Sequence, residues 1–249
     1  IKISQWFLDR MDSEWKINRN RFVNKFEFTD ANFCTTSPEI LGFNKSKKIH
    51  YIPNPVDPSF ETLNVFKKKT FNRDLFFAMS HGVHRGVLKG GKIDDRVNFL
   101  DKLQKFNPDI KFDIYGLDKV QPIWADHYFK TIENAKMGLN LSRGEPAKYY
   151  SSDRITQIVG NGLVCLIDEK TQYTNFFNKK EMVFYKDVSD LSEQIIKVSR
   201  DDKLRKSIAK KGKDKYLKYF NSTLVAEFII KNTLGIQSGT INIPYGEET

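Results

Sequence analysis

Short apolar runs alternate with polar, helix-forming stretches along residues 1–57. The pattern predicts strands at Ile1–Leu8, Ala31–Thr36 and Ile49–Ile52, separated by helices at Ser13–Glu27 and Pro38–Phe43. Strands that alternate with helices are typical of a parallel sheet with crossover connections. These few elements are too short for a complete doubly wound domain, so we expect them to be the last part of a longer one.

A proline-rich segment ends this first series. Pro53, Pro55 and Pro58 fall close together, and proline is excluded from helix interiors and central strands. Three consecutive lysines follow at 67–69, and we predict an exposed linker up to Arg73. The expected organisation is a partial domain at 1–57, a linker at 58–73, a complete domain at 74–234 and an irregular tail at 235–249.

A second alternating series follows the linker and begins with the compact apolar run Leu75–Met79. The pattern predicts further strands at 111–115, 137–141, 163–167 and 182–185, and helices at 94–106, 122–134, 151–161, 187–198, 201–220 and 222–234. No hairpin turn is predicted between neighbouring strands, which favours a parallel α/β sheet with helices on both faces.

The composition narrows the class of protein. The 249 residues are 39% hydrophobic and 29% charged, as in soluble globular proteins. No apolar run approaches the roughly 20 residues needed to span a membrane, no signal-peptide pattern is present, and Cys34 and Cys165 are too few for a disulfide framework. We therefore expect a cytoplasmic protein. The chain opens with Ile1 inside a predicted strand, and its first methionine is Met11, which is typical of a piece of a longer protein.

The formal net charge of +10 allows two interpretations: a polyanionic partner, or an ordinary lysine-rich surface. The densest stretch is 197–218, with ten Lys and Arg against three Asp. Its predicted buried side is formed by Leu204, Ile208, Tyr216 and Phe220. This helical region either contacts an acidic membrane or RNA, or is a solvated helix face.

Ligands of open α/β sheets bind beyond the carboxyl ends of the strands, where this sequence places several suggestive residues. The first strand end is the glycine-rich stretch 80–92, which contains Gly82, Arg85 and Lys89. Glycines allow backbone N–H groups to approach a phosphate closely, and the cations add charge. The stretch matches neither a P-loop nor a dinucleotide-binding motif, so a solvated surface loop is the alternative.

The second strand end carries Asn140 and Ser142 and leads to a helix that is expected to start near Ser152 and Asp153. Serine and aspartate are good N-caps, and unpaired N–H groups at a helix start suit a diphosphate. Arg154 in the first turn opposes the helix dipole, so a bound anion or a nearby carboxylate would explain it. Ordinary capping beside a surface arginine is the alternative.

Two further polar side chains are candidates. Gln157 lies one turn beyond Arg154, where it can hydrogen-bond a sugar hydroxyl or be a plain surface amide. Tyr115, followed by Gly116, ends a strand, where its ring can border a nucleobase or the edge of the core. The four histidines lack metal-ligand spacing, so no metal site is expected.

The ordered series from Asn140 to Asn221 resembles the donor-binding domain of GT-B glycosyltransferases of group 1, in particular those related to the spore maturation protein CgeB. The resemblance lies in Leu139–Ser142, the run Ser152–Cys165, the strand Met182–Asp187 and the helix start Asp202–Gly212. It extends more loosely to Asp74–Gly116, where the family has a phosphate loop and a Tyr-Gly strand end. Residues 1–57 look like the closing part of an acceptor domain.

The resemblance implies a GT-B fold with a complete C-terminal Rossmann-like domain and a truncated N-terminal one. It implies transfer of a sugar from a UDP- or GDP-linked donor, with retention and without a metal or other cofactor. The acceptor would be a glycan or a lipid-linked molecule, as in polysaccharide biosynthesis, with peripheral contact at the acidic inner face of the membrane. A nucleic-acid partner is not expected, because the aromatic residues are not interleaved with basic ones.

The residues matched by the resemblance would divide the donor between them. Gly82, Arg85, Lys89, Ser152, Asp153 and Arg154 would bind the diphosphate, Gln157 the ribose, Tyr115 and Gly116 the base, and Asn140, Ser142 and Tyr150 the sugar. The family usually has a glutamate in place of Gln157, and the catalytic residue would be Asp9 or lie upstream of Ile1. Two alternatives stay open: a non-catalytic anion-binding module that uses 197–218, and an inactive fragment of a glycosyltransferase.

Overall fold

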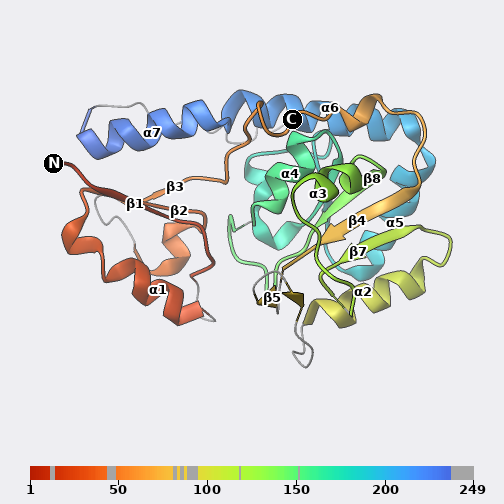
Figure 1. Cartoon of the computed structure of the whole chain (residues 1–249), viewed down its shortest axis with the longest axis horizontal. Coiled ribbons are helices and arrows are strands. Elements are labelled where there is room, and N and C mark those ends of the chain that lie inside the picture. Colours follow the sequence, from red (N-terminus) through yellow and green to blue (C-terminus); the bar gives the residue numbers. More distant parts are fainter. Residues whose placement is uncertain are drawn as a thin grey trace.

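The computed structural model describes residues 1–11, 15–43, 49–80, 83–84, 87–88, 95–117, 119–150 and 152–236. Two parallel sheets lie side by side, and a helical layer runs along one side of both (Figure 1). This layer consists of α6 (Asp202–Tyr219) and α7 (Ser222–Leu234), which follow each other directly in the chain.

The first sheet contains β1 (Ser4–Phe7), β2 (Ala31–Cys34) and β3 (Ile49–Tyr51), paired in parallel and in chain order. Helix α1 (Lys16–Val23) and a 3-10 turn at Pro38–Leu41 connect them, as the apolar pattern predicted. Every residue of β2 is buried, because this strand is covered on both faces.

Helix α7 covers one face of the first sheet, which the sequence did not predict. Val225 of α7 is buried with Ala31, Phe33 and Ile52, and Phe228 packs against the same cluster. The last helix of the chain therefore returns to its first strands.

The second sheet is also parallel, with the strand order β10-β9-β8-β4-β7. Its strands are β4 (Arg73–Ala78), β7 (Phe112–Tyr115), β8 (Ala135–Asn140), β9 (Val164–Asp168) and β10 (Val183–Tyr185). The remaining helices are α2 (Asp95–Phe106), α3 (Ala125–Ile132), α4 (Arg154–Gly160) and α5 (Val188–Arg200). The predicted parallel α/β architecture is confirmed.

Alternate side chains of β4 show that helices cover both faces of this sheet. Leu75 and Phe77 belong to a core that includes α2 and α5, whereas Phe76 and Ala78 belong to a core that includes α4. Because each strand is buried on both sides, its sequence is a continuous apolar run rather than an alternating one.

The strand order creates a crevice between β4 and β8. The chain leaves β4 towards β7 on one side and leaves β8 towards β9 on the other, and ligands bind at such a switch point. Gly138 brings α4 close to β8, since a Cβ at this position would lie 2.5 Å from Cγ1 of Ile158. The start of α4 is thereby held beside the carboxyl ends of both strands.

The predicted linker at 58–73 is mostly exposed, but buried residues occur within it and just before it. Val56 and Val65 are 0% and 2% exposed, and Glu61 is also buried. The backbone of Val56 pairs with Phe220 and Ser222 at the junction of α6 and α7. The proline-rich run around Val56 is therefore part of the packing beside α6 and α7, and its prolines favour an extended path there.

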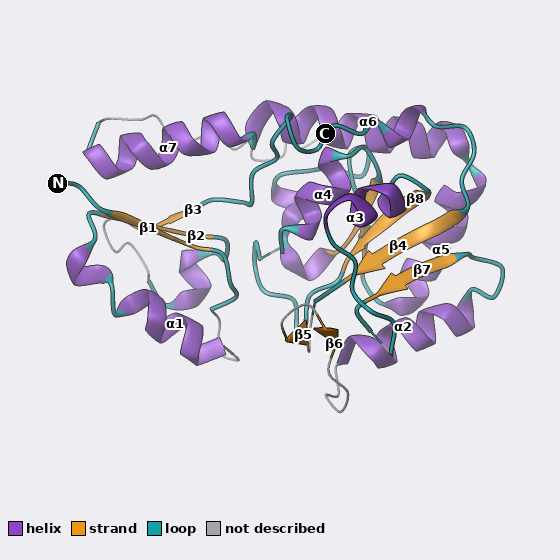
Figure 2. Cartoon of the chain, viewed as in Figure 1, coloured by secondary structure: helices purple, strands orange, loops and turns teal. Residues whose placement is uncertain are grey.

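A short antiparallel ribbon lies in the stretch after β4 that was predicted as a loop. Within the glycine-rich stretch, β5 (Val83–His84) and β6 (Val87–Leu88) form a two-stranded antiparallel ribbon (Figure 2). The ribbon lies near the carboxyl end of β4. Dipeptide strands are too short to give a periodic signal.

The cysteines fit the expectation from composition. Cys34 and Cys165 are both free and buried in strands, and burial raises the pKa of the Cys34 thiol to about 12. Across the part of the chain that the structure describes, no helix combines the length and apolar character that crossing a membrane requires.

Candidate functional site

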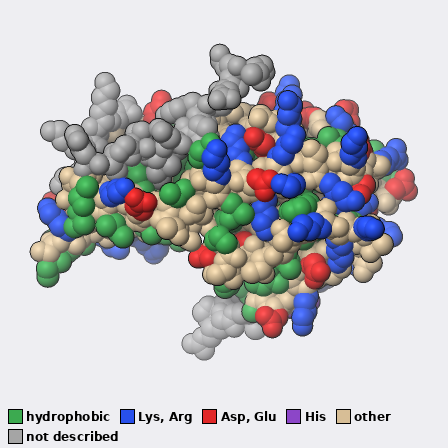
Figure 3. Space-filling view, turned by 90° about the horizontal axis from the view of Figure 1, so that it is seen from above, with side chains coloured by type: hydrophobic (Ala, Val, Ile, Leu, Met, Phe, Trp, Pro, Cys, Tyr) green, Lys and Arg blue, Asp and Glu red, His purple; other side chains and the backbone are tan. Residues whose placement is uncertain are grey.

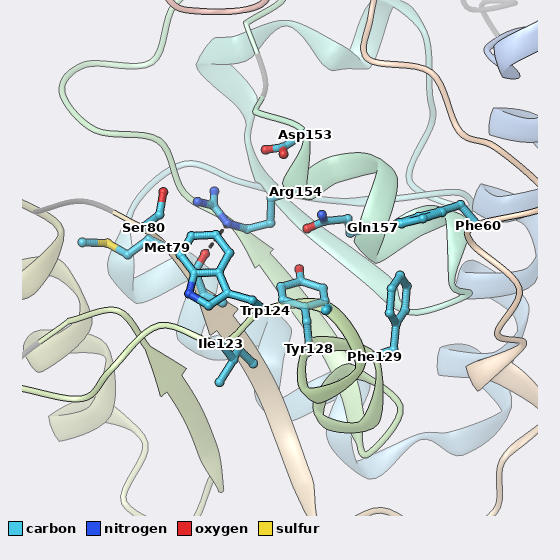
Figure 4. A pocket seen from close by; sticks show the side chains of 12 residues that line it. Phe60, Met79, Ser80, Ile123, Trp124, Tyr128, Phe129, Asp153, Arg154 and Gln157 are labelled. Atoms are coloured by element: carbon cyan, nitrogen blue, oxygen red, sulfur yellow. Dashed lines mark hydrogen bonds between the residues drawn. The ribbon is translucent and has the colours of Figure 1, made fainter. Parts of the chain in front are cut away.

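Three clefts open around the carboxyl ends of β4, β8, β9 and β10. The α3–α4 cleft, of about 220 Å³, is lined by residues that include Trp124, Tyr128, Arg154 and Gln157 (Figure 4). The inter-sheet cleft, of about 300 Å³, includes Asp9, Arg10 and Trp15 from the region of the first sheet and Arg143, Tyr150 and Arg154 from the second. The β10 cleft, of about 540 Å³, includes Asn140, Ser142, Asp168 and Tyr185.

Arg154 lines both the α3–α4 cleft and the inter-sheet cleft, although its side chain is only 8% exposed. Its Nε donates to the carbonyl of Ala78 at 2.8 Å, and Nη1 donates to the carbonyl of Leu141 at 3.1 Å. Nη1 also donates to the Ser152 hydroxyl at 3.1 Å, and the guanidinium lies 4.8 Å from the centre of the Phe77 ring. Arg154 therefore bridges the ends of β4 and β8 from the start of α4.

The charge of Arg154 has no close counter-charge. Within the described ranges, no carboxylate lies at ion-pair distance from its guanidinium, and burial lowers the pKa of Arg154. The nearby groups Tyr128 and Asp153 raise the pKa of Arg154, and the charge of Arg96 lowers it, so burial is the dominant cause of the lowered value. Burying a charge without a partner costs free energy, which an anion bound in the adjoining clefts would offset.

The start of α4 differs from the sequence expectation. The helix begins at Arg154 without a side-chain cap, so capping by Ser152 or Asp153 was wrongly predicted. The N–H groups of Ile155, Thr156 and Gln157 are already bonded to the carbonyls of Ser152 and Asp153. Because this tight first turn uses them internally, these N–H groups are not free for a phosphate, and the guanidinium is the cation at this position.

Aromatic side chains form the other wall of the α3–α4 cleft. Trp124 is 52% exposed, and Tyr128 and Phe129 follow it on α3. Figure 4 shows Trp124, Tyr128 and Gln157 around the same space as the Arg154 guanidinium. The Tyr128 hydroxyl is buried without a hydrogen-bond partner, and this burial raises the pKa of Tyr128. The α3–α4 cleft therefore has a flat aromatic wall on α3 and the positive charge of Arg154 at one end.

The other predicted residues are distributed as follows. Ser142 and Tyr150 line both the inter-sheet cleft and the β10 cleft, and Asn140 lines the latter. Tyr115 and Gly116 lie outside the lining of the three clefts; the Tyr115 ring packs edge-on against His127. Gly82, Arg85 and Lys89 lie outside the described residues.

The comparison with protein families identifies the family of the chain. The model of the glycosyl transferase-like family matches residues 96–231, more than half of the chain and including α2 to α6. The chain belongs to this family. Among curated proteins no match is found.

Solved structures of GT-B glycosyltransferases share the fold of this family member. HepE from Anabaena, solved with UDP-glucose, is 9% identical with a TM-score of 0.68, and the match covers 94% of this chain and 72% of HepE. TarM of S. aureus, solved with fondaparinux, α-GlcNAc-glycerol and UDP, is 12% identical with a TM-score of 0.65, covering 93% and 50%. An α-glucosyltransferase, solved with UDP-glucose and DNA containing an abasic site, is 12% identical with a TM-score of 0.64, covering 94% and 72%.

These likenesses confirm the GT-B fold expected from the sequence. The chain spans half the length of TarM. The relation to the CgeB group stays a prediction, as do the individual donor-binding residues.

Most Lys and Arg side chains of the basic helix α6 form contacts within the protein. Arg205 is completely buried against Asp202, and Lys213 is buried with its Nζ 2.6 Å from the Leu63 carbonyl. Lys206, Lys210 and Lys215 pair with carboxylates. On the face that carries α6, cations are interspersed with Asp and Glu (Figure 3). This arrangement is that of a solvated and packed helix face.

The structure adds site residues that sequence patterns missed. Arg10, Arg96 and Arg143 line the inter-sheet cleft, and Trp124 and Tyr128 line the α3–α4 cleft. Isolated arginines and aromatics carry no spacing signal, so only the strand order brings them together. In the part of the chain that the structure describes, no group of three or more His, Cys, Asp and Glu is arranged to hold a metal ion.

Proposed function

We propose that this chain is the donor-binding part of a glycosyltransferase that transfers a sugar from a nucleoside-diphosphate sugar to an acceptor. In this proposal, residues 74–234 form the donor-binding domain and residues 1–57 belong to the acceptor side. The solved neighbours HepE and the α-glucosyltransferase, which were crystallised with UDP-glucose, support the donor class. UDP and GDP both fit the expectation from the sequence.

The donor would lie across the crevice between β4 and β8. Its base would pack against Trp124 at the aromatic end of the α3–α4 cleft, and the ribose hydroxyls would meet Gln157 and Tyr128. The diphosphate would lie beside Arg154, at the junction with the inter-sheet cleft. This placement moves the proposed base site from Tyr115 to α3.

The proposed sugar site continues on the other side of Arg154. Asn140, Ser142 and Tyr150 line the adjoining clefts, and amide and hydroxyl groups are suited to sugar hydroxyls. Asp9 is exposed on the edge of the inter-sheet cleft, where it stays the candidate catalytic residue among residues 1–57.

The chemistry asked of this site is charge stabilisation. In sugar transfer, the bond from the anomeric carbon to the diphosphate oxygen breaks, and a bond to the acceptor oxygen forms while the acceptor loses a proton. The leaving diphosphate gains negative charge, and a preorganised guanidinium beside it lowers the barrier. Arg154 is fixed by three hydrogen bonds before any donor binds, so this stabilisation needs no reorganisation. We expect it to operate with retention and without a metal ion.

The observation that carries the proposal is the buried guanidinium of Arg154 without a carboxylate partner, placed where two clefts meet. An anion-binding module built on 197–218 is supported less well, because α6 uses Arg205, Lys206, Lys210, Lys213 and Lys215 internally. The inactive-fragment alternative predicts donor binding without transfer.

Isothermal titration of UDP and GDP into the 249-residue chain tests the proposal. We expect at least one of them to bind with a Kd of about 1–100 μM, and Arg154→Gln to weaken binding about 100-fold, because a charge-assisted contact is lost. A folded chain that binds neither nucleotide contradicts the proposal.

Arg73→Gln is the matched control, because Arg73 is an exposed arginine at the amino end of β4, far from the crevice. It should change the Kd less than twofold. Arg154 also supports the fold, so Arg154→Lys is measured beside Arg154→Gln; it keeps the charge and should bind UDP with intermediate affinity. Unfolding curves confirm that each variant is folded.

A further inference from the structure

The inter-sheet cleft contains more cationic groups than the proposed donor site uses. Arg10, Arg96, Arg143 and Arg154 line it, against the two carboxylates of Asp9 and Asp153. Arg10 follows β1, and its Nη1 donates to the carbonyl of Arg143, which follows β8. This hydrogen bond joins the two sides of the cleft. The cations therefore come from both sides of the cleft.

Arg143 is the exposed cation of this group. Its guanidinium lies 5.7 Å from the centre of the Trp15 ring, which holds it on the side of the first sheet. No carboxylate of the described chain lies at ion-pair distance from Arg143. An exposed arginine placed on an aromatic ring at a cleft is suited to bidentate binding of an oxyanion.

Trp15 also lines this cleft and carries a hydrogen-bond donor without a partner. Its indole Nε1–H is buried and has no hydrogen-bond partner among the described residues, although tryptophan N–H groups usually find one when buried. Indole can only donate, so the partner that it lacks is an oxygen acceptor.

We propose that Arg143 and Trp15 bind an anionic group on the acceptor, which is a glycan that carries phosphate, sulfate or carboxylate. This inference rests on the proposed function, because it assigns Arg154 to the donor diphosphate and leaves Arg143 for the other substrate. Arg143 is a binding residue in this proposal and takes no part in proton transfer.

A glycan fits these observations better than a nucleic acid. The cleft of about 300 Å³ has room for little more than one or two sugar residues, and its cations are gathered at one point. A nucleic-acid duplex needs a row of cations along the surface, whereas the cations of α6 are paired within the protein.

The test titrates the UDP-saturated chain with sulfated and uncharged dextran oligosaccharides of equal length, and with a DNA oligonucleotide. We expect the sulfated glycan to bind at least about tenfold more tightly than the uncharged one and than DNA. Arg143→Gln should weaken this binding about tenfold, because the charged donors are lost, and Trp15→Phe about threefold, because the indole N–H is lost while an aromatic ring remains. Arg73→Gln should have less than a twofold effect.

The Kd for UDP separates this inference from the proposed function. Arg143→Gln should leave the UDP affinity within twofold. An equal loss of UDP and glycan affinity would show that Arg143 belongs to the donor site, and unchanged glycan affinity would show that it binds nothing; both overturn the inference. Tighter binding of DNA that Arg143→Gln abolishes would overturn the glycan assignment. Failure of the unaltered chain to bind UDP would overturn the proposed function instead, while glycan titration without UDP would still test Arg143.

Discussion

Helices α4 and α6 each bury an arginine against an aromatic ring, but only the arginine of α6 has a carboxylate partner. Arg205 on α6 is 0% exposed, forms an ion pair with Asp202 at 2.7 Å and lies 4.5 Å from the Phe71 ring centre. Arg154 on α4 is 8% exposed and lies 4.8 Å from the Phe77 ring centre, but only neutral oxygens accept its hydrogen bonds.

The two guanidinium groups differ in which anions they can reach. Arg205 pairs with the Asp202 carboxylate of its own helix and lines none of the three clefts, whereas Arg154 lines two of them. A buried cation with a partner is part of the packing, and a buried cation without one at a cleft is expected to bind a ligand. The following changes test this distinction.

Arg205→Ala should give the largest loss of stability. It removes two hydrogen bonds to Asp202, one to the Lys68 carbonyl and the packing on Phe71. We expect the free energy of unfolding to fall by about 3 kcal/mol in urea titration. Lys206→Ala removes the exposed partner of the same Asp202 and should cost less than about 0.5 kcal/mol. If Arg205→Ala also abolished UDP binding by folded protein, the contrast between the two arginines would be lost.

Trp124→Ala should act on binding alone. Trp124 is half exposed at the mouth of the α3–α4 cleft, so its removal should change the free energy of unfolding by less than about 0.5 kcal/mol. Loss of stacking on the base should weaken UDP binding about tenfold. Phe28→Ala, at an exposed aromatic near the first sheet, is the control. Unchanged UDP affinity in Trp124→Ala would place the base elsewhere.

Gln157→Glu should have a smaller effect with a distinctive signature. A carboxylate accepts hydrogen bonds from ribose hydroxyls more strongly than an amide does, so UDP should bind about threefold more tightly. The gain should disappear with 2′,3′-dideoxy-UDP, which lacks these hydroxyls. An equal gain with both nucleotides would remove Gln157 from the ribose site.

Lys210→Gln should have the smallest effect, because Lys210 pairs with Asp214 on the solvent side of α6. We expect its affinity for UDP, acidic vesicles and RNA to stay within twofold of the unaltered chain. A large loss of vesicle or RNA binding would revive the anion-binding alternative.

The apolar pattern predicted nearly every element, because buried parallel strands are compact apolar runs and amphipathic helices separate them. The apolar pattern did not predict burial that depends on contacts between segments distant in the sequence. Val56 and Val65 lie in a segment of prolines and lysines, yet both side chains are buried, and the backbone of Val56 pairs where α6 and α7 meet. The contact of α7 with β2 joins the two ends of the chain, which no local pattern contains.

Sequence patterns pointed to cleft-lining residues that follow one strand, but not to those that come together from different strands. Arg154 and Gln157 follow β8 and share a helix, so the strand-end rule found them. The N–H groups of α4 were assigned to a phosphate because the sequence does not show that its first turn closes on Ser152 and Asp153. Trp124 and Arg143 come from different loops, and only the strand order places them around the same crevice.

The most direct test of the central claim measures the Kd of UDP and of UMP for the unaltered chain and for Arg154→Gln. These ligands differ by one phosphate, so the four values isolate the coupling between that phosphate and the guanidinium. We predict that the unaltered chain binds UDP about 30-fold or more tightly than UMP, and that the ratio falls to about 3 in Arg154→Gln. An equal ratio in both proteins would contradict the account, because Arg154 would then be a packing residue like Arg205.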